Sequence, residues 1–129
     1  MSNLKIRDLS VGDWVKIDIY PTPYKIIDLS SRGYVWLLGR NRVAPIRVIE
    51  PIPITPEILK SNGWYEDDYD TCTDYITDNT IIMYNKERKD WKACVMNGSP
   101  VVRVKVFFSY VHELQHALRL AGLDEDIRL

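Results

Sequence analysis

Glu50-Pro51-Ile52-Pro53-Ile54 separates two parts of the sequence that follow different patterns. Its two prolines favour an extended backbone, because proline fixes its own φ and restricts the residue before it. Short strand-like segments precede this stretch, whereas helical and strand patterns are mixed after it. The sequence therefore predicts an α+β protein with one lobe over residues 1–50 and a second over residues 51–129, the two forming one compact unit.

On the N-terminal side, four short apolar segments are separated by turn residues. Gly12-Asp13 is a turn that leads into a strand beginning at Trp14, and the other segments cover residues 24–29, 34–38 and 43–49. Pro45 makes the fourth segment an edge strand, because proline cannot donate to a central ladder. Four strands of this length and spacing predict an SH3-like small β-barrel.

On the C-terminal side, capping residues mark two helices. Thr55 is a good N-cap and Gly63 a good C-cap, which predicts a short helix over residues 56–62. Residues 110–121 predict an amphipathic helix that Ser109 caps and Gly122 ends, with Val111, Leu114, Leu118 and Ala121 on its apolar stripe.

Between these helices the sequence predicts an antiparallel meander. Its strand-like segments are 75–76, 80–84, 91–96 and 100–108, and Asn97-Gly98 is a strong signal for the last hairpin turn. Residues 66–70 are rich in carboxylates and are interpreted as a solvated acidic loop. A short edge strand is expected over residues 124–129.

The charge of the 129-residue chain is close to balanced, with a formal net value of −1, but it is unevenly distributed. Residues 1–50 hold eight basic and five acidic side chains, and residues 51–85 hold one basic and seven acidic. Residues 86–129 are again slightly basic. A nearly neutral chain has no strong field toward nucleic acid or an anionic membrane. We therefore expect no membrane partner, and nucleic-acid binding through the basic first part is kept only as an alternative hypothesis.

The sequence also indicates a compartment. The start of the chain lacks the apolar core of a signal peptide, and no apolar run approaches the roughly 18 residues that span a bilayer. Cys72 and Cys94 lack the spacing of metal ligands and are expected to be free thiols in a reducing environment. A cytoplasmic location follows as the expectation.

His112-Glu113-Leu114-Gln115-His116 matches the H-E-x-x-H pattern on the predicted C-terminal helix. Two histidines four residues apart can bind zinc together, while the glutamate acts as general base toward the metal-bound water. A third ligand is missing downstream, since Arg119 and Gly122 stand where the longer metzincin pattern needs glycine and histidine. Upstream carboxylates that could complete such a site are Asp67, Asp68 and Asp70.

The alternative is that His112 and His116 belong to the polar face of an amphipathic helix. We favour this interpretation and predict no metal ion or other cofactor, because a pattern with three fixed positions often arises by chance. No glycine-rich phosphate loop, nucleophile elbow or paired-carboxylate pattern is present either. A minimal zinc hydrolase that uses His112, Glu113 and His116 remains the enzymatic alternative.

Three stretches together carry a resemblance to a known family: 9–15 with Gly12-Asp13-Trp14-Val15, 50–59 with the proline connector, and 110–115 in the last helix. The chain resembles small uncharacterised proteins encoded by gut anaerobes, their phages and other mobile elements. Their patterns are G-N/D-W-V, E-P-I-P-L-T and Y-V-H-Q-L-Q-N. Glu113 and His116 stand where the last pattern has Gln and Asn. The resemblance implies a phage or mobile-element accessory protein of the bacterial cytoplasm, and it implies no activity.

Aromatic and cationic residues gather in the predicted barrel, which makes it the leading candidate for a ligand site. Such groups can stack on rings and bind phosphates, although aromatics also fill small cores. We therefore predict a non-catalytic binding module for a protein or small-molecule ligand. Its site is expected between the barrel and the second lobe, around Trp14, Trp36, Arg40 and Arg42.

Overall fold

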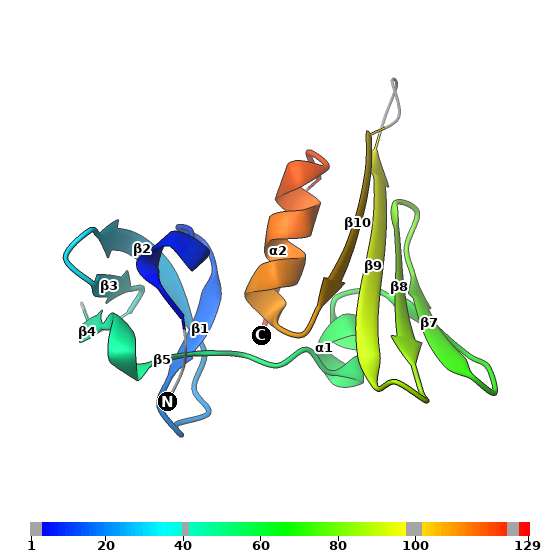
Figure 1. The fold of residues 1–129 in the computed structure, drawn as a ribbon, viewed down its shortest axis with the longest axis horizontal. Coiled ribbons are helices and arrows are strands. Elements are labelled where there is room, and N and C mark those ends of the chain that lie inside the picture. The colour runs from blue at the N-terminus through cyan, green and yellow to red at the C-terminus, as the bar shows by residue number, and fades with distance from the viewer. Residues whose placement is uncertain (1–3, 40–41, 98–101, 124–126) are drawn as a thin grey trace. The chain divides into compact units, whose positions relative to one another are not determined.

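The structure, a computed structural model, describes residues 4–39, 42–97, 102–123 and 127–129 (Figure 1). The chain is an α+β protein with two antiparallel sheets and two α-helices. It divides into two compact units, unit 1 over Met1–Pro53 and unit 2 over Ile54–Leu129. Within the described residues, neither helix has the length and apolar character needed to span a bilayer.

Unit 1 contains one five-stranded sheet in the order β4-β3-β2-β1-β5. Its elements are η1 (Ile6–Asp8), β1 (Trp14–Ile17), β2 (Tyr24–Ser30), β3 (Tyr34–Leu37), β4 (Arg42–Pro45), η2 (Ile46–Val48) and β5 (Ile49–Pro51). The predicted strand over 43–49 is wrong as a single element, because the chain turns at Ile46 and returns to pair with β1. This sheet is not closed into a barrel in the described residues, so the SH3-like barrel is not confirmed.

The core of unit 1 lies on one face of its sheet. Successive residues of a strand point to opposite faces, and in β3 Val35 and Leu37 are buried while Tyr34 and Trp36 are exposed. Strand β2 has a register shift between Ile26 and Asp28, which leaves Ile27 exposed at the irregularity. The buried residues of this core are Leu9, Val15, Ile26, Val35, Leu37, Ala44 and Ile49.

Unit 2 contains a second five-stranded sheet in the order β10-β9-β8-β7-β6. Its elements are α1 (Pro56–Ser61), β6 (Tyr65–Asp68), β7 (Cys72–Ile76), β8 (Thr80–Asn85), β9 (Asp90–Asn97), β10 (Val102–Phe108) and α2 (Val111–Leu120). The predicted acidic loop over 66–70 is corrected, because its first three residues lie in edge strand β6 opposite β7. Residues 127–129 form no strand, and residues 98–101 and 124–126 of the predicted turn and edge strand lie outside the described residues.

The ends of both helices follow from their capping residues. The Thr55 hydroxyl accepts a hydrogen bond from the Ile58 N–H at 3.3 Å, as the sequence predicts for α1. Gly63 and Gly122 follow the two helices with φ values of +94° and +74°, which confirms both as C-terminal caps. Helix α2 begins at Val111, and its N-cap is Tyr110 rather than the predicted Ser109.

One face of the second sheet is covered by α2, which packs against β9 and β10 (Figure 1). Side chains on this covered face form the core of unit 2, where Ile82, Ala93 and Val95 are inaccessible to solvent. The Trp91 ring lies 4.7 Å from the Tyr84 ring and 6.3 Å from the Phe108 ring, measured between centroids. The alternating side chains point to the opposite side of the sheet, which we call the open face.

Candidate functional site

The H-E-x-x-H pattern lies on α2, but its histidines do not form the expected polar face. His112 is only 4% exposed, and its ring stacks on Tyr110 with centroids 6.0 Å apart. The His116 ring approaches His112 edge-on at 5.6 Å. Gln115 is also buried, so α2 is buried over a wider arc than the predicted apolar stripe. The expectation that His112 is a solvated polar-face residue is therefore wrong.

Glu113 of this pattern caps the N-terminus of α2. Its Oε1 accepts hydrogen bonds from the N–H groups of Ser109 and Tyr110, at 2.9 and 3.1 Å. These two groups precede the first turn, so the carboxylate satisfies donors that the helix itself cannot. Among the described residues, no group of three or more His, Cys, Asp and Glu side chains is placed to hold a metal ion.

Two of the upstream carboxylates, Asp67 and Asp68, have partners of their own at the β6 edge of the sheet. The Tyr69 hydroxyl donates to Asp67 at 2.6 Å, and the Lys86 ammonium lies 2.8 Å from Asp68. The hydrogen bond from Lys86 lowers the pKa of Asp68, and a second from Thr73 acts in the same direction. Helix α2, which carries the histidines, packs against β9 and β10, whereas these carboxylates lie on β6 at the other edge of the sheet. The carboxylates and the histidines therefore belong to opposite sides of the sheet order.

Substitution of Glu113 tests its capping role. Glu113→Ala should lower the free energy of unfolding by about 1 kcal/mol, because two N–H groups lose their acceptor. Glu113→Gln keeps an acceptor oxygen and should stay within about 0.5 kcal/mol of the parent. Urea denaturation followed by circular dichroism measures both values. Equal stability of the parent and the alanine variant would contradict the capping role.

The four predicted ligand residues lie in unit 1, and the structure places two of their side chains. Trp14 is half-buried with the Lys25 ammonium 5.5 Å from its ring centroid, and Trp36 is exposed opposite Asp28 and Val43. Both tryptophans alternate with buried residues and therefore point away from the core, with strand β2 between them. The Arg40 position and the Arg42 side chain lie outside the described parts, so the four-residue site stays a prediction.

Trp36 belongs to a larger exposed surface that the sequence patterns did not single out. Five large apolar side chains of β2, β3 and β4 and their flanks are each between 40 and 59% exposed. Trp36 and Val43 are direct cross-strand neighbours, and Leu38 follows β3 with its N–H donating to Lys25 at 2.8 Å. We call this surface the aromatic face; its members are Ile27, Tyr34, Trp36, Leu38 and Val43. Alternation in Tyr34-Val35-Trp36-Leu37 is the sequence signal that could have revealed it.

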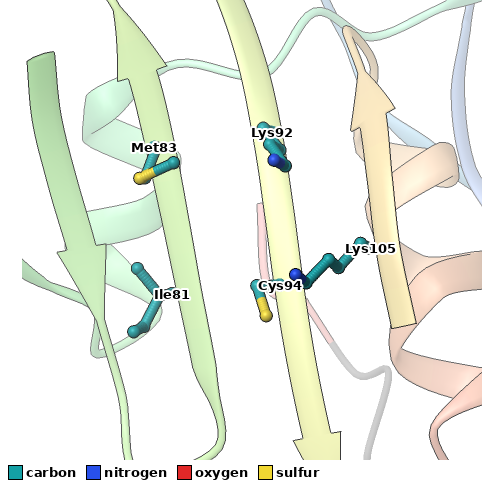
Figure 2. A pocket seen from close by; sticks show the side chains of 5 residues that line it. All are labelled: Ile81, Met83, Lys92, Cys94 and Lys105. Carbon is teal, nitrogen blue, oxygen red and sulfur yellow. The ribbon is translucent and has the colours of Figure 1, made fainter. Parts of the chain in front are cut away.

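A second exposed apolar surface is the open face of the sheet in unit 2. Tyr65, Ile81, Met83, Met96 and Phe107 are all solvent-exposed there. A shallow pocket of about 220 Å³ lies on this face. Figure 2 shows the side chains that line it, which come from β8, β9 and β10. They are Ile81, Met83, Lys92, Cys94 and Lys105. Its floor is apolar, and both of its charged groups are cationic.

Fold and surfaces together define a two-unit α+β protein with an exposed apolar surface on each sheet. No protein-family model, curated protein or solved structure matches the chain. The resemblance to phage and mobile-element proteins therefore stays a prediction from the sequence.

Proposed function

We propose that this protein is a non-catalytic binding module that holds an extended segment of a partner protein on the aromatic face of unit 1. The observation that carries the proposal is the grouping of five large apolar side chains, each 40–59% exposed, on adjacent strands. Single exposed apolar residues are ordinary, whereas a contiguous group of this kind is typical of interaction surfaces.

The composition of this face favours a protein partner. Tryptophan and tyrosine often contribute most of the binding energy at protein interfaces, because their rings bury a large area with little loss of side-chain entropy. The side chains stand on the solvent-exposed face of a sheet, whereas small-molecule sites are concave and enclose most of their ligand. A chain segment laid across the strands can cover all five side chains.

The predicted SH3-like class suggests the type of segment. Aromatic-lined surfaces of such domains bind proline-rich segments in the polyproline II conformation, which lose little entropy on binding. The order β4-β3-β2-β1-β5 and the short 3-10 turn before β5 support the proposal that unit 1 is SH3-like. We therefore propose a proline-rich segment as the ligand. The resemblance in sequence adds the context of a phage or mobile-element accessory protein.

A random peptide library displayed on phage and selected on the immobilised full chain tests this function. Peptides that are enriched should be proline-rich, and each is then synthesised and titrated by fluorescence anisotropy. Trp36→Ala should weaken binding by about tenfold or more, as expected for a central aromatic anchor. Tyr20→Ala is the matched control, because Tyr20 is an exposed aromatic of unit 1 in the connection between β1 and β2.

The outcome for the two variants decides the proposal. Binding lost in Trp36→Ala and kept in Tyr20→Ala assigns the peptide to the aromatic face. If no peptide is enriched, or if every enriched peptide binds Trp36→Ala as tightly as the parent, the aromatic face is not the binding surface.

A further inference from the structure

The open face of unit 2 has an acidic side and a basic side. Asp67 on β6 and Asp74 on β7 are cross-strand neighbours on this face, at one edge of the sheet. Lys92 on β9 and Arg103 and Lys105 on β10 belong to the other side. The remaining carboxylate on this face of β9 is Asp90 at the strand end, where Arg88 lies 3.4 Å away. The apolar residues Ile81 and Met83 of β8 lie between the two sides.

The strand register arranges these groups in rows across the sheet. One row runs Asp67, Asp74, Met83, Lys92 and Phe107, and the next runs Tyr65, Ile76, Ile81, Cys94 and Lys105. Each row therefore has β8 at its centre and charges of opposite sign, or an aromatic and a cation, on its two sides.

A two-fold axis parallel to the strands makes this arrangement self-complementary. The axis runs along β8 on the open-face side of the sheet. Rotation about it places β7 of one copy over β9 of the other, so each row faces the same row of the second copy. Asp74 then faces Lys92 of a second copy, twice by symmetry, around a central contact between the two Met83 side chains. An axis perpendicular to the strands that crosses this row would place Asp74 over Asp74 instead, and like charges facing each other are unfavourable. Aligned sheets pack with a rotation of about 30°, which disturbs the central rows least.

We propose that the open face of unit 2 is the interface of a symmetric homodimer, in which Asp74 of each copy pairs with Lys92 of the other across the two Met83 side chains. The shallow pocket of Figure 2 is then filled by apolar side chains of the second copy, because Ile81 and Met83 lie at the centre of the contact. This inference rests on unit 2 alone and is independent of the function proposed for unit 1.

The environment of Asp74 supports the pairing. Partial burial raises the pKa of Asp74, and the neighbouring charge of Asp67 raises it further, while a hydrogen bond from the Cys72 thiol acts in the opposite direction. The single chain therefore holds this carboxylate where its ionised form is disfavoured. In this row, the β6–β7 side of a single chain holds the carboxylates Asp67 and Asp74 and no cation. Lys92 of a second copy supplies the positive charge that would face Asp74.

The size of the face predicts a weak dimer. Five strands spaced about 4.8 Å apart, each with two to four outward residues, cover only a few hundred Å² on each copy. Such an interface falls below the roughly 1,200 Å² total of standard stable complexes, so dissociation constants from about 10 µM to 1 mM are expected. The mass of the dimer should therefore appear only in concentrated samples.

Sedimentation velocity of the full chain from about 5 µM to 1 mM covers this range of affinity. The parent should shift from monomer toward dimer as concentration rises. Asp74→Lys and Lys92→Asp should each weaken self-association by about tenfold or more, because each places two pairs of like charges in the interface. Lys89→Asp is the matched control, since it makes the same charge change in the turn between β8 and β9 and should leave the dimer unchanged.

Mixing the two interface variants gives the decisive measurement. The Asp74→Lys chain carries a lysine at both interface positions, and the Lys92→Asp chain carries an aspartate at both. In a mixed dimer each lysine of the first chain faces an aspartate of the second, so two opposite-charge pairs return and association should recover. Recovery also shows that both variants are folded. A parent that stays monomeric throughout, a dimer that both variants leave intact, or a mixture that does not recover would each overturn the proposal.

Discussion

Leu114→Ala should lower the free energy of unfolding by about 2–5 kcal/mol, because it removes buried methyl groups and leaves a cavity. Leu114 is inaccessible to solvent in α2, the helix that covers β9 and β10. Leu120 lies six residues further along the same helix and is 71% exposed. The same substitution at Leu120 should therefore change stability by no more than about 0.5 kcal/mol.

Urea denaturation of the two variants at one protein concentration measures this difference. The comparison controls for helix propensity, since both substitutions replace leucine by alanine within one helix. A loss at Leu114 no larger than at Leu120 would mean that α2 does not pack on the sheet as the structure shows. A large loss would also assign Leu114, the apolar residue between the two histidines, to the core of unit 2.

The elements whose signals are local were predicted well from the sequence. Thr55 and Gly63 bound α1 as expected, because a cap depends on residues within one turn of the helix end. The buried stripe of α2 follows from its 3.6-residue period in the same way. The return of β5 to β1 was missed, since a pairing between residues some 35 positions apart leaves no mark in a short window.

The candidate surfaces depend on contacts that are not local, and this limits what the sequence can show. Alternation along β3 places Tyr34 and Trp36 on one face. That Val43 lies beside them follows only from the register of β3 against β4. Acidic and basic halves of unit 2 are visible in the sequence as charge counts. Only the strand order places Asp74 and Lys92 on opposite sides of one row. His112 was misassigned because the burial of a helix face depends on what packs around it.

Gly122→Ala should be the second most damaging substitution, with a loss of about 1–3 kcal/mol. Gly122 ends α2 with φ +74°, and a left-handed backbone costs an L-residue about 1–2 kcal/mol. It also closes the helix, because its N–H donates to Arg119 and the next N–H donates to Leu118. A Cβ at this position would lie 3.2 Å from the Asn97 side-chain nitrogen, which donates to the Ala121 carbonyl at 2.8 Å.

Gly63→Ala separates the two causes of this loss. Gly63 ends α1 with φ +94° and the same pair of closing hydrogen bonds. Among the described residues, apart from its chain neighbours and the backbone of α1, no heavy atom lies within 4 Å of the Cβ that alanine would add. The additional loss of stability at Gly122, about 0.5–1.5 kcal/mol, should therefore come from the hydrogen bond between Asn97 and the Ala121 carbonyl, which breaks when the Asn97 side chain moves away. In an Asn97→Ala background this bond is already absent, so Gly122→Ala should cost no more than Gly63→Ala. An unchanged difference between the two glycines in that background would show that Asn97 is not its cause.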